Sequence, residues 1–176
     1  MKLRISHQTT PIGPLGLAVD DRGQLRGVAF GDQEAMAVAA VQRVMAREYP
    51  LAERGEGPAP HELGAALDAY FGGDLDVLAR IYWSLEGVQG SDGFQARVWR
   101  ELALTAPGQT VSYGEMAKRV GEPGAAQATG VALNRNPIPL VLPCHRVVGT
   151  DGRMVGFGGG LERKTWLLRH EGALLI

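Results

Sequence analysis

A proline-rich segment in the C-terminal half, residues 134–148 (NRNPIPLVLPCHRVV), constrains the fold of this chain more than any other feature. Pro137, Pro139 and Pro143 each fix their own φ angle, lack a backbone N–H and bias the preceding residue away from helical geometry. We therefore expect these prolines to hold the backbone extended. It leads directly to Cys144, the only cysteine among 176 residues.

A single cysteine excludes an internal disulfide framework and any zinc site built from several cysteines. The histidines at positions 7, 61 and 170 show no metal-ligand spacing, so we predict no metal and no other cofactor. The N-terminus lacks the apolar stretch of a signal peptide, and no apolar run approaches the roughly 18 residues of a membrane span. We expect a soluble, cytoplasmic, monomeric protein that does not bind membranes.

The charge is distributed unevenly, although the net charge is only −1. Residues 1–88 carry 8 Lys and Arg against 12 Asp and Glu, a net charge of −4, whereas residues 89–176 carry 10 against 7, a net charge of +3. The basic half is consistent with an anionic partner.

The acidic front half has the pattern of an α/β scaffold. Apolar runs at 10–19 and 25–30 flank an Asp/Gly turn and predict a β-hairpin. Helical spacing, ended by Pro50 in one case and by Gly72-Gly73 in the other, predicts helices at 34–48 and 61–71. The remaining assignments are a loop at 53–60 and a strand at 77–85. No group of residues in this half indicates chemistry.

The basic half begins after a linker at 87–93 with an amphipathic helix from Phe94. Ser112 and Glu115 fit a capping box that opens a helix running to about Val120. A second short helix, 125–134, follows a Gly-containing break. Two short helices across such a turn are typical of a helix-turn-helix, although an ordinary αα corner has the same pattern. Small residues dominate the second helix, which suits either tight packing or a close approach to the minor groove.

The environment of Cys144 favours a reactive thiol over an inert buried one. His145 and Arg146 supply cationic partners beside it, which is the setting that favours a thiolate. Neighbouring residues in an extended chain point to opposite faces, so we expect His145 to reach the sulfur through a water molecule. A carboxylate on the far side of the ring would fix its tautomer. The glycine-rich residues 149–160 follow at once.

Four motifs together resemble one known family. They are Pro143-Cys144-His145-Arg146-Val147-Val148, Asn136-Pro137, Ser112-Tyr113-Gly114-Glu115 and Trp166-Leu167-Leu168-Arg169-His170-Glu171-Gly172. The chain between Phe94 and Gly172 is similar to the O6-alkylguanine-DNA alkyltransferases, also called methylated-DNA–protein-cysteine methyltransferases.

The resemblance implies a fold of the α+β/α class. Residues 1–88 would form a ribonuclease-H-like α/β domain. Residues 89–176 would form a helical, DNA-binding alkyltransferase domain, with a helix-turn-helix at about 112–134 and the Pro-Cys-His-Arg segment as its active site.

The resemblance also implies a catalytic group. Cys144 would be the nucleophile and final alkyl acceptor, and His145 would take the thiol proton through water. Glu171 would orient the imidazole, and Asn136 would shape the hinge before the cysteine segment and support the same hydrogen-bond network. Tyr113 would donate a hydrogen bond to the guanine ring as negative charge develops there.

The implied partner is double-stranded DNA carrying an alkylated guanine or thymine, bound through the minor groove without an obligate protein partner. The substrate would meet the Val147 carbonyl, Phe157, backbone N–H groups near Gly158, and Lys164. The DNA would meet the recognition-helix residues Ala125, Ala126, Gln127 and Arg135.

Three positions depart from the family pattern. Gln127 stands where the family carries an arginine that fills the gap left by the extruded nucleotide, so we expect weaker support for base extrusion. Phe157 and Gly158 replace a tyrosine and a serine of some relatives. These changes affect the tolerance for bulky alkyl groups in a direction that the sequence does not fix.

Three other functions fit parts of the same sequence. A cysteine hydrolase would use Cys144 and His145 but would turn over repeatedly without DNA. A non-enzymatic lesion-binding module would lack the reactive cysteine. A helix-turn-helix regulator would carry long polar side chains where this second helix is mostly alanine.

Overall fold

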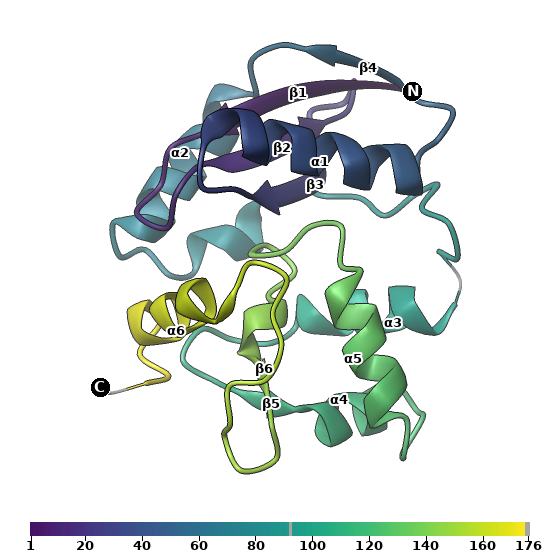
Figure 1. The fold of residues 1–176 in the computed structure, drawn as a ribbon, viewed down its shortest axis with the longest axis vertical. Coiled ribbons are helices and arrows are strands. Elements are labelled where there is room, and N and C mark those ends of the chain that lie inside the picture. Colours follow the sequence, from purple (N-terminus) through teal and green to yellow (C-terminus); the bar gives the residue numbers. More distant parts are fainter. Residues whose placement is uncertain (92, 175–176) are drawn as a thin grey trace. The chain divides into compact units, whose positions relative to one another are not determined.

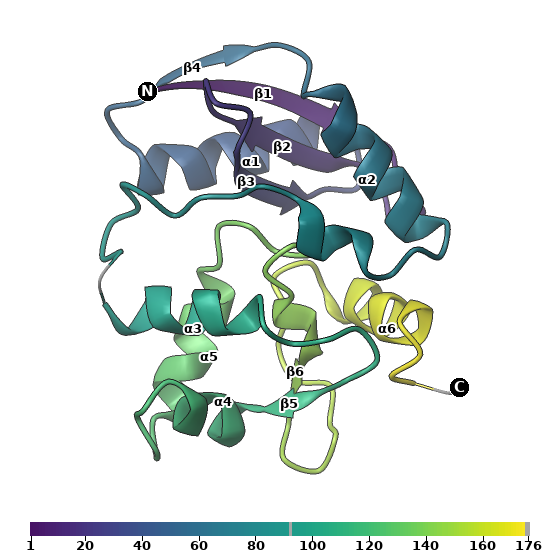
Figure 2. The ribbon, with the colours of Figure 1, turned by 180° about the vertical axis from the view of Figure 1, so that it is seen from behind.

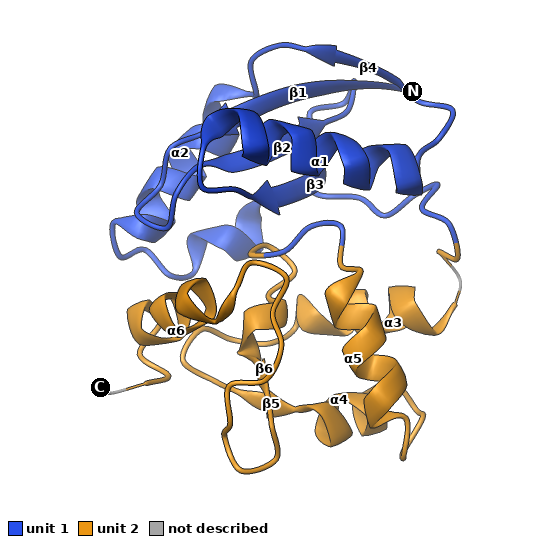
Figure 3. Ribbon diagram, in the orientation of Figure 1, with its two compact units in different colours: residues 1–89, 137–139 blue, residues 90–136, 140–176 orange. Residues whose placement is uncertain are grey.

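The computed structural model describes residues 1–91 and 93–174 and divides into two compact units (Figure 3). Unit 1 comprises residues 1–89 and 137–139, and unit 2 comprises 90–136 and 140–176. The segment 137–139 belongs to unit 1 because Ile138 is fully buried and the Val28 N–H donates to the Pro137 carbonyl (3.0 Å). The predicted domain 89–176 therefore does not include this short segment.

Unit 1 is built on a four-stranded sheet with the order β3–β2–β1–β4 (Figure 1). The strands are β1 (Lys2–Gln8), β2 (Leu15–Val19), β3 (Leu25–Phe30) and β4 (Glu53–Glu56). β2 and β3 form the predicted antiparallel hairpin, with a register irregularity at Ala18/Val19. β1 pairs antiparallel with β2 and parallel with β4.

Helices α1 (Glu34–Glu48) and α2 (His61–Phe71) have the predicted bounds. Comparison of Figures 1 and 2 shows them on opposite sides of the sheet. All five residues of β2 are buried, as expected for a strand covered on both faces. Gly16 permits the close approach of α1, because a Cβ at that position would lie 2.2 Å from the Ala37 carbonyl oxygen.

Two sequence assignments in unit 1 are wrong. Residues 53–56 form strand β4 rather than a loop. The strand forms because its backbone pairs with β1, whereas its charged side chains give no sequence pattern typical of a strand. Residues 77–85 do not form a strand: Val77–Arg80 is the 3-10 helix η1, and beyond it Trp83 makes one isolated bridge to Leu25. β1 was not anticipated as a strand.

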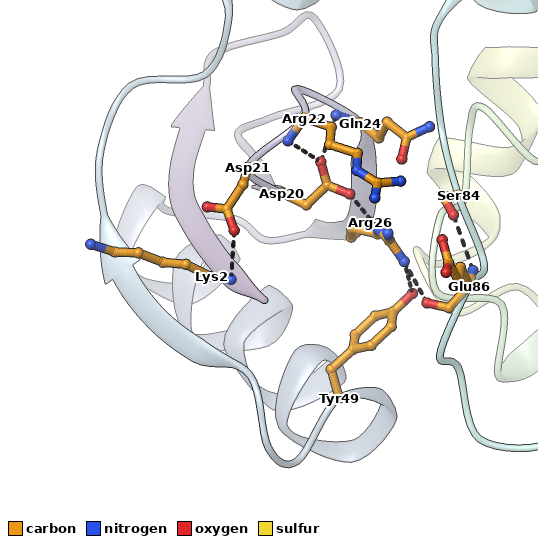
Figure 4. Close-up of polar contacts among 9 residues, drawn as sticks. All are labelled: Lys2, Asp20, Asp21, Arg22, Gln24, Arg26, Tyr49, Ser84 and Glu86. Atoms are coloured by element: carbon orange, nitrogen blue, oxygen red, sulfur yellow. Dashed lines mark hydrogen bonds and ion pairs between the residues drawn. The ribbon is translucent and has the colours of Figure 1, made fainter.

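A buried ion pair organises one edge of unit 1 (Figure 4). Arg26 Nε donates to Asp20 Oδ2 (2.7 Å), and its Nη1 donates to the Tyr49 hydroxyl (3.5 Å) and to the Glu86 carbonyl. Asp20 Oδ1 also accepts the backbone N–H groups of Arg22 and Gln24. The pair therefore joins the hairpin turn to the end of α1 and to the segment around Glu86.

Unit 2 is mainly helical. Its elements are α3 (Phe94–Leu102), β5 (Val111–Ser112), α4 (Tyr113–Arg119), α5 (Ala126–Asn134), the 3-10 helix η2 (Cys144–Arg146), β6 (Val147–Val148) and α6 (Leu161–His170). The predicted cap at α4 is confirmed on the serine side, since Ser112 Oγ accepts the Glu115 N–H (3.0 Å). Trp99 Nε1 donates to the Ala132 carbonyl (2.7 Å) and fastens α3 to α5. In the described residues, no helix combines the length and the apolar composition that crossing a membrane requires.

The Arg26 pair gives a stability prediction. Replacing Arg26 by methionine leaves Asp20 buried (3% exposed) without its charged partner, and removing one member of such a pair typically costs about 3–5 kcal/mol. Urea unfolding of Arg26→Met should show a loss of this size. The exposed Arg54→Met provides the control and should unfold like the wild type. Equal stability of the two variants would contradict the structural role of the pair.

Candidate active site

The segment around Cys144 is not extended as predicted. Cys144–Arg146 is a turn of 3-10 helix, and Leu140 before it has a positive φ of 76°. The tight turn follows Pro143 and is continued by β6, which pairs in parallel with β5. Since the chain turns here, the side chains of His145 and Arg146 do not point to opposite faces, and both contact Glu171.

Glu171 is the centre of a buried polar cluster. It caps the C-terminal end of α6, and its Oε2 lies 3.0 Å from His145 Nε2. Arg146 holds both carboxylate oxygens, with Nε at 2.9 Å from Oε1 and Nη2 at 2.9 Å from Oε2. Arg146 Nη1 donates to the Thr105 carbonyl (2.6 Å). The side chains of His145 and Glu171 have no solvent exposure.

These contacts determine the ionisation of the cluster. Burial alone would raise the pKa of Glu171, but hydrogen bonds and charges from His145 and Arg146 hold that pKa far below its usual range. Burial lowers the pKa of His145 despite the opposing effect of Glu171, and the charges of Arg146 and Lys164 lower it further. The ring is therefore neutral at pH 7. Because Nε2 faces an ionised carboxylate, it carries the proton, and the buried Nδ1 is the basic nitrogen.

Cys144 is 6% exposed and, at rest, is a thiol. Burial raises its pKa to about 11, although the Asn136 amide and the Lys164 charge act in the opposite direction. The expectation that Arg146 favours the thiolate is wrong, because its guanidinium is bound to Glu171. The thiol must therefore lose its proton when it reacts.

Asn136 and Lys164 bind backbone carbonyls just before and just after the cysteine turn. Asn136 Nδ2 donates to the Leu142 carbonyl (2.7 Å), so the side chain braces the chain just before Cys144. Lys164 is fully buried, and its Nζ donates to the carbonyls of Val147 (2.6 Å) and Val155 (2.9 Å). Burial lowers the pKa of Lys164 to about 8, and the negative charge that Cys144 carries as a thiolate acts in the opposite direction.

The other residues expected to contact substrate surround the glycine-rich loop. The Tyr113 hydroxyl donates to the Val155 carbonyl (3.2 Å), and burial raises its pKa, as does the negative charge of Cys144 in its thiolate form. Phe157 is half-buried, whereas Gly158 is exposed with open space where a Cβ would stand, so the backbone does not require a glycine there. The Val147 carbonyl already accepts from Lys164 but has a second lone pair.

The expected DNA-contact residues lie along α5 and its ends. Gln127 and Arg135 are exposed, and Ala125 and Ala126 are half-buried. Thr129 and Ala132 are buried on the side that packs inside unit 2. Small residues of this helix thus serve internal packing, whereas its exposed positions are Gln127, Ala128, Val131 and Asn134.

The sequence reasoning missed the role of Arg146 and of Thr105. Both lie far in sequence from Glu171, and only the fold brings them to one carboxylate. A buried Arg-Glu pair has no local signal apart from two charged residues in otherwise apolar segments. Among residues 1–91 and 93–174, no three His, Cys, Asp or Glu side chains are grouped so that they could hold a metal ion.

Comparison with known proteins places this site in a defined class. Residues 93–173 match the family described as 6-O-methylguanine DNA methyltransferase, DNA binding domain. A methylated-DNA–protein-cysteine methyltransferase of Shigella flexneri is 40% identical over 167 residues, covering 95% of this chain and 94% of that protein.

Solved structures agree with this placement. The O6-methylguanine methyltransferase of Mycobacterium tuberculosis aligns with a TM-score of 0.73 and 34% identity over 97% of this chain and 93% of that one. The same organism's OGT in complex with DNA gives a TM-score of 0.73 over 98% and 94% of the two chains, at 34% identity. The chain belongs to the methylated-DNA–protein-cysteine methyltransferase family.

The thiol pKa predicts how Cys144 reacts with small reagents. Because only the thiolate is nucleophilic and the pKa is about 11, the rate of iodoacetamide addition should rise steadily with pH up to pH 9. Lys164→Met should react more slowly than the wild type at pH 7, because it lacks the charge that favours the thiolate. Intact-mass time courses measure both rates.

The exposed Lys118→Met removes a lysine from α4 and is the control, with an expected wild-type rate. A rate that levels off below pH 8 would mean that the thiolate is already formed at rest and would contradict this description of the site.

Proposed function

We propose that this protein repairs O6-alkylguanine, and by the same chemistry O4-alkylthymine, in DNA by transferring the alkyl group to Cys144. The observation that carries the proposal is a buried thiol beside a neutral imidazole whose far nitrogen is held by an ionised carboxylate. This combination provides a proton acceptor for a nucleophile that is protonated at rest.

The reaction begins with removal of the thiol proton. It passes from Cys144 Sγ through a bridging water molecule to His145 Nδ1. The sulfur then attacks the alkyl carbon in line with the bond to O6. The S–C bond forms as the C–O bond breaks, and the electron pair of that bond goes to the guanine. The guanine finally takes up one proton, so the thiol proton is replaced by the alkyl group on sulfur.

Hydrogen bonds to the departing guanine assist this displacement. The Tyr113 hydroxyl, which donates to the Val155 carbonyl in this structure, would instead donate a hydrogen bond to the guanine ring as negative charge develops there. The Val147 carbonyl would accept from the guanine amino group, and backbone N–H groups near Gly158 would meet the alkylated oxygen. Phe157 and Lys164 would line the same pocket.

DNA binding is assigned to unit 2, the part that matches the family's DNA-binding domain. α4 and α5 would act as a helix-turn-helix, and the small residues Ala126 and Ala128, which lie outside the buried face of α5, suit a close approach through the minor groove. Because the target carbon lies within the duplex, the base must leave the stack and enter the pocket. Unit 1 would correspond to the ribonuclease-H-like domain implied by the family resemblance.

A cysteine hydrolase is the main alternative for the same residues. A hydrolase forms a thioester, which water attacks at its carbonyl, whereas the alkyl transfer forms a thioether that offers water no such carbon. Each molecule of a transferase should therefore act once, and this difference separates the two functions.

Mass spectrometry tests the proposal directly. When the protein is mixed with excess oligonucleotide bearing O6-methylguanine, its intact mass should increase by one methylene and the modification should map to Cys144. Cys144→Ala should show no gain. Repeated turnover, with more lesion repaired than protein present, would contradict the proposal.

Gln127 gives a second prediction. Arginine at this exposed position adds charge, reach and a flat stacking surface beside an extruded base. We expect Gln127→Arg to accelerate repair of duplex substrate and to leave single-stranded substrate unchanged. Gln42→Arg makes the same charge change on an exposed position of α1 and is the control. Equal acceleration on both substrates would mean that the residue does not act in base extrusion.

A further inference from the structure

Arg146 takes no part in the proposed chemistry, and its binding to Glu171 rules out the role of a cationic partner for Cys144 that the sequence indicates. Its side chain is 5% exposed, and its guanidinium donates to both oxygens of Glu171 and to the Thr105 carbonyl. It lies two residues from Cys144, yet it faces the carboxylate rather than the sulfur.

The charges facing His145 come from three positions. Glu171 lies at the end of α6 and accepts from Nε2, Lys164 lies on α6, and Arg146 belongs to the same 3-10 turn as the histidine. Cys144, the remaining titratable neighbour, is a thiol at rest. Glu171 is the only anion of this set and favours a protonated ring, whereas both cations oppose protonation.

A carboxylate whose only partner is a histidine would draw a proton onto the ring and form an imidazolium–carboxylate pair. An imidazolium has no lone pair and accepts no proton from a thiol. In this structure a bidentate guanidinium compensates the carboxylate charge first, and the two groups share Oε2 as an acceptor.

We propose that Arg146 is a positioning residue that neutralises Glu171 and thereby keeps the His145 ring uncharged and able to accept the thiol proton. It does not touch the reacting atoms and acts through Glu171. The inference rests on the proposed role of His145 as the base.

Two variants separate the charge of Arg146 from its geometry. Arg146→Met removes the charge at similar length, and Arg146→Lys keeps a charge but loses the planar fork that holds two oxygens. Both should make His145 titrate at higher pH than in the wild type, with the larger shift in the methionine variant. The lysine variant also keeps the test available if the methionine variant fails to fold.

The first measurement is the NMR titration of the His145 ring in the full-length protein, with the signal assigned by its absence in His145→Ala. The second is the single-turnover rate on O6-methylguanine oligonucleotide at pH 6 and pH 8. At pH values below the pKa of the ring, each unit of upward pKa shift lowers its neutral fraction about tenfold. The pH 6 to pH 8 rate ratio of Arg146→Met should therefore be lower than that of the wild type.

The control is Arg26→Met, which breaks a buried arginine–carboxylate pair in unit 1. It should lose stability while the His145 titration and the rate ratio stay as in the wild type. An unchanged His145 titration in a folded Arg146 variant, or a rate reduced by the same factor at both pH values, would overturn the proposal. A full wild-type rate in His145→Ala would instead overturn the role of His145 as the base.

Discussion

The Glu171 carboxylate joins three separate parts of unit 2 at a single buried point. It is bound by His145 and Arg146 of the cysteine turn, it ends α6, and through Arg146 it reaches the Thr105 carbonyl after α3. A buried ion is tolerated only when its partners are fixed and its hydrogen bonds are satisfied. The geometry of the reactive turn is therefore tied to the packing of the helices, and a change in one of these contacts affects the others.

The same cluster explains how a deeply buried thiol can be both inert and reactive. At rest, burial keeps the proton on Cys144 and protects the sulfur from small electrophiles and oxidants. The neutral His145 ring provides an acceptor that is used when a substrate carbon lies in line. For a protein that acts once, a low background reactivity matters more than a fast resting nucleophile, because each accidental modification removes one molecule from use.

Local patterns predicted the elements that depend on local signals. The bounds of α1 and α2 followed from apolar spacing and from Pro50 and Gly72, and the Ser112 cap followed from its spacing to Glu115. β4 was missed because its pairing comes from β1, and the extended course expected for the cysteine segment was wrong because tertiary contacts turn it into a 3-10 helix. The family motif placed Cys144, His145 and Glu171 in one site, whereas the binding of Arg146 to Glu171 required the fold.

The short proline segment at 137–139 has a consequence for dissecting the molecule. The chain leaves unit 2 after Asn136, contributes three residues to unit 1, and returns at Leu140 just before the cysteine turn. A C-terminal fragment that begins at the linker 87–93 would expose Ile138, which is fully buried in the whole chain. It would also lack Val28 of β3, whose N–H donates to the Pro137 carbonyl. The C-terminal half is thus not an independent unit, because unit 1 holds the segment 137–139 that leads to Cys144.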